Sequence, residues 1–200
     1  MRIIGITGGV GAGKSEILSF IRKNYPCEIY LADEVAHKIK EKGQPCYEQL
    51  VELLGRDVLN EEDGEINKAK MAAIIFADEK ILQLVNEIVH PGVKEYILAR
   101  IKEAEEKKSV ELFFIEAALL IEAGYETMVD ELWYIHADKE VRRKRLQENR
   151  GYSSEKIEQI MNCQLSEEDF FEKCDFVIDN SGKIEDSYNQ IRNKLRGLVE

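Results

Sequence analysis

Short apolar runs alternate with amphipathic or charged stretches along the chain. The apolar runs are too short for helices and are rich in β-branched and aromatic residues, which is typical of strands. They cover residues 2–7, 28–32, 110–115, 131–137 and 175–178. The stretches between them are predicted to be helical and cover residues 15–24, 34–42, 139–149, 153–171 and 184–199. Strands that alternate with helices predict an α/β fold, with an open parallel five-stranded sheet and helices on both faces.

The middle of the chain departs from this alternation, because it contains no convincing strand. Helices are predicted at 47–54, 68–76 and 79–89. The sequence His90-Pro91-Gly92 predicts an interruption after the third of them, with Pro91 in the first turn of a further helix that reaches about residue 107. We therefore expect a single domain over residues 1–200, with a helical substrate-binding insertion at about 43–108.

Composition and charge narrow the functional class. Lys and Arg number 28 against 39 Asp and Glu, so the formal net charge is −11. Because an acidic chain is unsuited to nonspecific binding of nucleic acid or anionic membrane, we expect neither as a partner. No protein partner is evident. The four cysteines form no CxxC pair, and no signal peptide or membrane-spanning run is recognisable, so we expect reduced thiols and a cytoplasmic location.

Candidate chemistry begins at residues 8–15, which fit the phosphate-binding pattern G-x-x-x-x-G-K-S/T without a mismatch. A predicted strand precedes this loop and an amphipathic helix follows it. The glycines allow successive backbone N–H groups to turn toward phosphate oxygens. Lys14 is expected to bridge the β- and γ-phosphates of ATP, and Ser15 to ligate Mg²⁺. The predicted nucleotide-binding residues of the loop are Gly9, Val10, Gly11, Ala12, Gly13, Lys14 and Ser15.

This loop is shared by kinases, GTPases and ATPases. A GTPase should also carry DxxG and NKxD motifs, and neither is present. An ATPase motor needs a longer chain and an apolar strand that ends in acids; the strand ending at Glu116 leaves that option weakly open. Glu116 could order Mg²⁺ through water or be an ordinary strand-end acid. The small size and the helical insertion favour a kinase for a small molecule.

Asp33 is the candidate for proton transfer, because it follows the second predicted strand directly. The carboxyl ends of parallel strands line the ligand crevice, so its carboxylate is expected to face the phosphates. There it could accept the proton of an attacking hydroxyl, hold a Mg²⁺-bound water, or serve only as the N-cap of the next helix. Spacing alone does not choose among these roles.

A basic run, residues 142–145, stands out in an acidic chain. Four consecutive residues cannot share one helix face, so we expect Arg145, and with it Arg142, to face the transferring phosphoryl group. His90 precedes a proline and is either a packed histidine at a helix break or a contact to the acceptor. His136 lies inside a predicted strand and is interpreted as structural.

An ordered set of motifs along nearly the whole chain resembles the dephospho-CoA kinase family. The motifs are residues 5–15, Ala32-Asp33, Gly43 and Pro45, Leu54-Gly55, Asp63-Gly64, Ile75-Phe76, His90-Pro91-Gly92-Val93, Leu119-Leu120-Ile121-Glu122, Arg145, Gln164 and residues 175–182. The resemblance implies a P-loop kinase fold and the transfer of phosphate from ATP to the 3′-hydroxyl of the dephospho-CoA ribose. It implies that Asp33 is the base and that His90 lies in the acceptor-binding part.

The resemblance also places Asn180 and Gly182 in a turn near the ATP adenine, and Arg145 on a helix that leads to a mobile lid at about 142–154. The chain departs from the family pattern at Leu31, His37 and Ala118, where Asp, Arg and Pro are usual, and the spacing from Arg145 to Arg150 is one residue longer. Two alternatives stay open: another nucleotide or sugar-acid kinase on this fold, and a nucleotide-gated binding protein.

Overall fold

The computed structural model describes residues 1–197. Its strands are β1 (Arg2–Thr7), β2 (Cys27–Leu31), β3 (Leu112–Glu116), β4 (Glu131–His136) and β5 (Phe176–Asp179). Its helices are α1 (Lys14–Asn24), α2 (Ala32–Lys38), α3 (Tyr47–Leu54), α4 (Lys68–Ala77), α5 (Glu79–Lys107), α6 (Lys139–Arg150), α7 (Ser154–Asn162), α8 (Glu167–Lys173) and α9 (Ile184–Leu195). Two short 3₁₀ turns lie at Arg56–Val58 and Tyr125–Met128.

The strands form one sheet in the order β2-β3-β1-β4-β5, and the pairs β1-β3, β1-β4 and β4-β5 are parallel. The predicted open parallel five-stranded sheet is confirmed. β1 lies at the centre, where Gly5 pairs with Ile115 of β3 and Leu132 of β4. The segment after β1 therefore leaves the sheet at the middle of its carboxyl edge, which is where open α/β sheets bind ligands.

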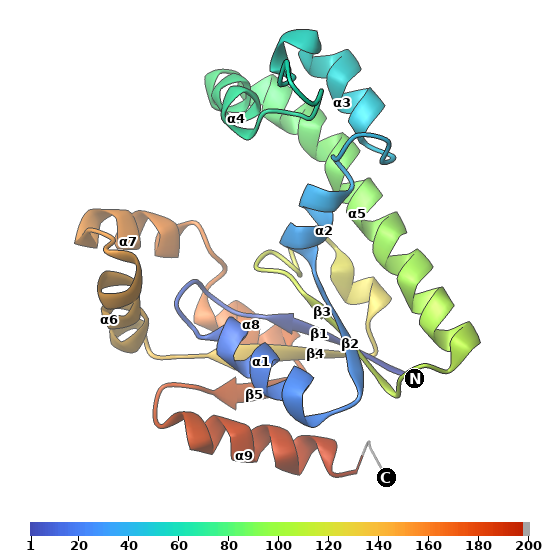
Figure 1. Ribbon diagram of the computed structural model, residues 1–200. Coiled ribbons are helices and arrows are strands. Elements are labelled where there is room, and N and C mark those ends of the chain that lie inside the picture. Colours follow the sequence, from blue (N-terminus) through green and yellow to red (C-terminus); the bar gives the residue numbers. More distant parts are fainter. Residues whose placement is uncertain (198–200) are drawn as a thin grey trace. The chain divides into compact units, whose positions relative to one another are not determined.

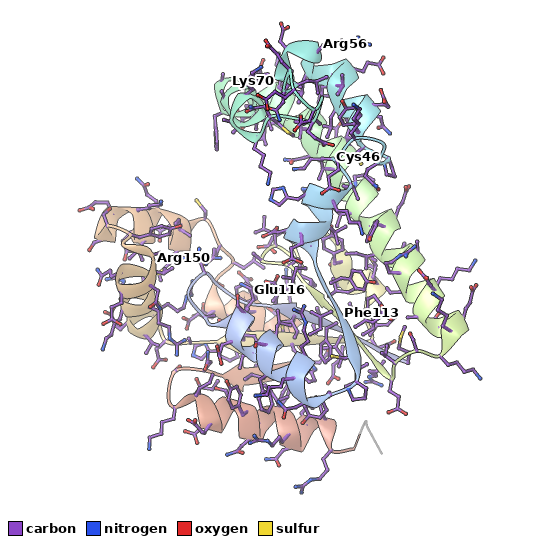
Figure 2. The ribbon with its side chains drawn as sticks, viewed as in Figure 1. Cys46, Arg56, Lys70, Phe113, Glu116 and Arg150 are labelled. Atoms are coloured by element: carbon purple, nitrogen blue, oxygen red, sulfur yellow. The ribbon has the colours of Figure 1, made fainter. Side chains whose placement is uncertain are left out.

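The chain divides into two compact units. The first consists of residues 1–29 and the chain from Lys107 onward, and the second of Tyr30–Glu106. Phe113, in the first unit, and Cys46, in the second, are both buried (Figure 2).

Among residues 1–197, no helix has both the length and the apolar character needed to cross a bilayer. The predicted insertion at about 43–108 overlaps the second unit, and its role in substrate binding stays a prediction.

In the first unit, helices cover both faces of the sheet (Figure 1). Trp133 and Tyr134 are successive residues of β4, so their side chains point to opposite faces. Trp133 packs edge-on against Phe176 of β5, and the Lys194 ammonium of α9 lies over the Phe176 ring. Tyr134 stacks on Phe170 of α8, with ring centroids 4.6 Å apart. Helix α9 therefore covers one face of this edge of the sheet, and α8 covers the other.

Helix α5 runs without a break from Glu79 to Lys107, so the predicted interruption at His90-Pro91-Gly92 is wrong. One stripe of buried side chains continues past the proline and consists of Val85, Val89, Val93, Ile97, Ile101 and Ala104. A proline inside a helix costs about 3 kcal/mol. Each buried aliphatic side chain contributes about 1.5–3 kcal/mol, so the stripe outweighs the proline.

Gly92 lets α5 approach the segment that precedes α3. A Cβ atom on Gly92 would lie 2.4 Å from Cys46 Sγ and 3.2 Å from Ile39 Cδ1, and both of these side chains are buried. Replacing glycine by alanine in an open helix gains about 1 kcal/mol, whereas overpacking a core costs about 1–3 kcal/mol. We expect Gly92→Ala to lower the free energy of unfolding by about 1–2 kcal/mol in urea denaturation.

The matched control combines Gly92→Ala with Cys46→Ala, which removes the sulfur that the new methyl group would meet. This double variant should be more stable than the sum of the two single changes implies. An unchanged or raised stability of Gly92→Ala alone would contradict the close packing of α5 on Cys46.

Two helices, α7 and α8, replace the single helix predicted over residues 153–171. Ser166 forms a capping box: its hydroxyl accepts from the Asp169 backbone N–H at 3.1 Å, and the Asp169 carboxylate accepts from the Ser166 N–H. Reciprocal capping satisfies backbone donors that a helix start leaves open, so a new helix begins here. The helix predicted at 184–199 is confirmed over Ile184–Leu195, and residues 198–199 lie outside the described range.

Candidate active site

Residues 8–13 connect β1 to α1 and curl back against α6 and the turn after β5. Gly13 is the N-cap of α1 with φ at 93°, and a Cβ there would lie 2.4 Å from Asn180 Nδ2. A Cβ on Gly9 would lie 2.2 Å from a terminal nitrogen of the Arg142 guanidinium. Glycine is needed at both positions because neighbouring side chains lie too close to leave room for a Cβ atom. At Gly13 the left-handed backbone is a second reason.

Lys14 is the first residue of α1, and its side chain folds back over the loop. Its ammonium donates a hydrogen bond to the Gly8 carbonyl at 2.7 Å and lies 3.6 Å from Glu116 Oε1. The pairing of β1 with β3 places Glu116 beside Ile6, directly before the loop. A cation and a carboxylate are therefore held together at the mouth of the glycine loop, with both side chains only 14% exposed.

Arg142 of α6 clamps the other side of the loop. Its Nε donates to the Val10 carbonyl at 2.9 Å, and a terminal nitrogen donates to Gln164 Oε1 at 2.7 Å. The same Gln164 oxygen accepts from the Val10 N–H at 3.2 Å. Arg142 is 8% exposed, and this burial lowers its pKa from the ordinary arginine value. These bonds hold both backbone groups of Val10 and fix the conformation of the loop.

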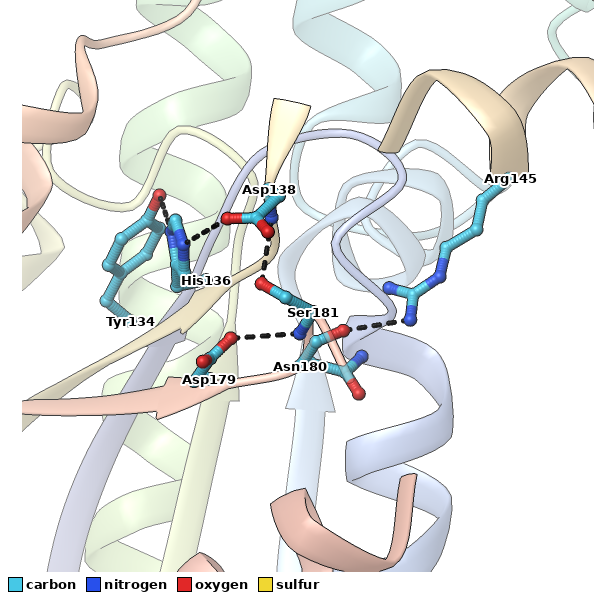
Figure 3. A network of polar contacts seen from close by, with 7 residues as sticks. All are labelled: Tyr134, His136, Asp138, Arg145, Asp179, Asn180 and Ser181. Carbon is cyan, nitrogen blue, oxygen red and sulfur yellow. Dashed lines mark hydrogen bonds and ion pairs between the residues drawn. The ribbon is translucent and has the colours of Figure 1, made fainter. Parts of the chain in front are cut away.

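Arg145, one turn beyond Arg142, joins the loop to the turn after β5 (Figure 3). Its guanidinium donates to the Ala12 carbonyl at 3.3 Å and to the Asn180 carbonyl at 2.8 Å. The Asn180 amide donates to the same Ala12 carbonyl at 2.7 Å, and its oxygen accepts from the Ser187 hydroxyl at 3.0 Å. Asn180 is 2% exposed, so its side chain braces the loop from inside the protein.

A second polar chain ties the end of β4 to the same turn (Figure 3). The Asp138 N–H donates to Ser181 Oγ at 3.0 Å, and Asp138 Oδ1 lies 3.5 Å from His136 Nε2. His136 Nδ1 lies 3.4 Å from the Tyr134 hydroxyl, whose pKa is raised to about 12, chiefly by burial. His136 thus supports the turn that carries Asn180, which agrees with its structural interpretation. Gly182 lies in this turn as well.

The other two cations of residues 142–145, Arg143 and Lys144, make contacts away from the loop. Arg143 pairs with Glu140 and Glu158, and Lys144 Nζ lies 3.9 Å from Glu148 Oε1. Of residues 142–145, Arg142 and Arg145 contact the loop, and the expectation that they face the transferring phosphoryl group stays a prediction. The contacts of Arg142 and Gln164 with Val10 could not be predicted from the sequence. Gln164 comes from a distant segment, and no spacing pattern links it to the loop.

Asp33 and His90 belong to the second unit. Helix α2 begins at Ala32 with Leu31 as its N-cap, so Asp33 lies within the first turn and its interpretation as the N-cap is wrong. Asp33 is exposed, and it interacts electrostatically with His37, one turn further along α2. His90 is exposed in the middle of α5.

Comparison with known proteins identifies the family. Residues 2–186 match the family model described as dephospho-CoA kinase. A dephospho-CoA kinase from Aquifex aeolicus is 36% identical over 199 residues, which cover 100% of this chain and 98% of that protein. One from Carboxydothermus hydrogenoformans is 35% identical over 194 residues, covering 97% and 93%.

A solved structure shares the fold. The crystal structure of TT1252 from Thermus thermophilus matches with a TM-score of 0.80 at 28% identity, over 100% of this chain and 98% of that one. The similarity therefore extends over the sheet, the phosphate loop and the helical second unit. With a family model that covers most of its length, the chain belongs to the dephospho-CoA kinase family of ATP-dependent kinases.

Proposed function

We propose that this chain transfers the γ-phosphoryl group of Mg²⁺-bound ATP to the 3′-hydroxyl of the dephospho-CoA ribose, producing CoA and ADP. The observation that supports this most directly is the clamped glycine loop, with Lys14 folded over it. Loop N–H groups and the positive end of α1 favour an anion, and the Lys14 ammonium adds a full charge. Lys14 exchanges its bond to the Gly8 carbonyl for the β- and γ-phosphate oxygens.

The loop also fits Mg²⁺ delivered with the nucleotide. Mg²⁺ usually binds through one or two protein oxygens together with substrate phosphates. Ser15, beside Lys14 at the start of α1, offers a hydroxyl, and Glu116, at the end of β3, offers a carboxylate. We infer that Ser15 ligates the ion and that Glu116 orders one of its waters. Bound there, Mg²⁺ supplies charge neutralisation on the phosphate oxygens.

Asp33 is our candidate for the general base. It is an exposed carboxylate two residues beyond β2, which is a strand of the same sheet. A carboxylate that accepts the proton of the 3′-hydroxyl increases the nucleophilicity of that oxygen as it attacks phosphorus. Because its side chain caps no helix, its carboxylate remains available for this role.

Different segments of the chain are proposed to bind the acceptor and to form the lid. We infer that residues 43–108, with His90, bind the acceptor, and that residues 142–154 act as a lid with Arg142 and Arg145 at its base. ATP and dephospho-CoA are the partners, with Asn180 and Gly182 next to the adenine.

All four cysteines are free, which fits the reducing cytoplasm as the place of action.

Arg145 is proposed to stabilise the transferring phosphoryl group. Arg145→Ala should lower kcat by about 10²-fold while the Kd for ATP changes only a few-fold, because charge develops at the transferring group only in the transition state. The matched control is Lys144→Ala, its neighbour, whose side chain is 72% exposed. A lower melting temperature with normal kcat would instead restrict Arg145 to bracing the loop.

The position of the new phosphate tests the proposal most specifically. Phosphorus and proton NMR of the isolated product should locate one added phosphate on the 3′-oxygen of the ribose. A phosphate on any other oxygen of the acceptor would refute the proposed reaction.

A further inference from the structure

The second unit contains a cavity of about 550 Å³. Its lining comes from the end of α2 and the following turn, from the segment before α4, and from the first turns of α4. Three of the lining side chains are basic: His37, Lys40 and Lys68. The other lining residues are Glu41, Asn60, Glu65, Ile66, Asn67 and Met71.

The two lysines act on each other electrostatically and form no ion pair in the part of the chain that the structure describes. Neither Lys40 nor Lys68 forms an ion pair with any residue in the described range 1–197. Burial lowers the pKa of Lys40, and the nearby positive charge of Lys68 lowers it further. Two acids also line the cavity: Glu65, whose carboxylate accepts the Lys42 N–H at 3.0 Å, and Glu41, which is exposed. An anion between the lysines would relieve their repulsion.

The segment before α4 reinforces this charge. Asn67 is the N-cap of α4, and its oxygen accepts from the backbone N–H groups of Ala69 and Lys70. Its amide donates to Asn60 Oδ1 at 2.8 Å, so both asparagines of the lining are held in place. The positive end of the α4 dipole lies beside Lys68, the first residue of the helix.

The cavity is linked to the proposed base through α2. Asp33 and His37 are four residues apart on this helix, so they share one face at an axial separation of about 6 Å. Both side chains are exposed. An acceptor whose hydroxyl reaches Asp33 can therefore place a neighbouring anionic group near His37 and the lysines.

We propose that this cavity binds the diphosphate of the acceptor, with Lys40, Lys68 and His37 as its donors. The inference rests on the proposed function and names the part of the acceptor that this site recognises. In dephospho-CoA the ribose carries both the reacting 3′-hydroxyl and, through C5′, the diphosphate. Two ammonium groups match the two negative charges of a diphosphate diester, and charge-assisted hydrogen bonds of this kind are the strong ones. The diphosphate thus aligns the 3′-hydroxyl with Asp33.

Two acceptor-site ligands that differ in the diphosphate test this proposal. The variants are Lys40→Gln and Lys68→Gln, and Lys102→Gln is the control, because its exposed side chain lies on α5 outside the cavity. At saturating ATP, each cavity variant should raise the KM for dephospho-CoA by about 10- to 100-fold with kcat changed only a few-fold. Adenosine carries the same ribose without a diphosphate, so its inhibition constant against dephospho-CoA at saturating ATP should stay unchanged.

Each alternative result has a distinct meaning. A KM for dephospho-CoA that is unchanged in both variants would overturn the role of the cavity and leave the proposed function intact. Equal weakening of adenosine and dephospho-CoA would also overturn it, because the lysines would then shape the nucleoside site as a whole. The variant Lys68→Arg, which keeps the positive charge, should have a KM for dephospho-CoA close to that of the wild-type protein. A wild-type protein that fails to phosphorylate dephospho-CoA at any concentration would remove the proposed function, and this inference with it.

Discussion

Replacing Lys14 by alanine should reduce the rate of phosphoryl transfer by at least about 10³-fold. The Lys14 ammonium lies over the glycine loop, bonded to the Gly8 carbonyl at 2.7 Å, and it is the only cationic side chain of residues 8–15. Its loss should therefore remove the charge that we propose acts on the β- and γ-phosphates. Steady-state kinetics with saturating ATP and dephospho-CoA measures the effect.

The matched control for this change is Lys23→Ala. Lys23 lies in the last turn of the same helix, α1, and is exposed. Its removal should leave kcat unchanged, and both variants should remain folded. A Lys14→Ala protein with near-normal kcat would eliminate the loop as the phosphate site.

Asp33→Asn should lower kcat by about 10²- to 10⁴-fold and leave the Kd for ATP nearly unchanged. Asparagine keeps the shape of the side chain but cannot take the proton of the ribose hydroxyl. Because Leu31 and not Asp33 is the N-cap of α2, the substitution removes no capping bond. The expected cost in stability is limited to the helix-dipole contribution of about 0.3–1 kcal/mol.

Glu34→Gln controls for the loss of an acidic charge in the first turn of α2, because Glu34 is the exposed neighbour of Asp33. It should retain wild-type kcat. If Asp33→Asn likewise kept kcat within a few-fold of wild type, Asp33 would not be the base, and the proton would have to leave by another route.

The sheet and the phosphate loop were predictable from the sequence because their signals are local. Each strand is a short apolar run, and residues 8–15 form a contiguous pattern whose chemistry requires glycine, lysine and serine at fixed places. The helix boundaries that were predicted wrongly depend instead on tertiary contacts. Pro91 predicts a helix break, yet α5 continues, because the stripe that includes Val89 and Val93 is buried on both sides of it.

The surroundings of the loop were less predictable, because they depend on tertiary contacts. The basic run predicts Arg142 as a phosphoryl contact, whereas its guanidinium donates to the Val10 carbonyl and to Gln164. The cavity of His37, Lys40 and Lys68 draws its donors from two separate segments, and no spacing rule connects them. The start of α8 is an exception, because the capping box of Ser166 and Asp169 is also visible in the sequence.

We propose that this protein consumes ATP by transferring its γ-phosphoryl group to dephospho-CoA. The measurement that tests it most directly is ADP release from ATP and Mg²⁺ with and without dephospho-CoA, combined with the mass of the acceptor product. The structure and the family predict rapid release only when dephospho-CoA is present, with a product heavier by one phosphate. Slow ATP hydrolysis that is indifferent to dephospho-CoA, with no phosphorylated acceptor, would contradict the claim.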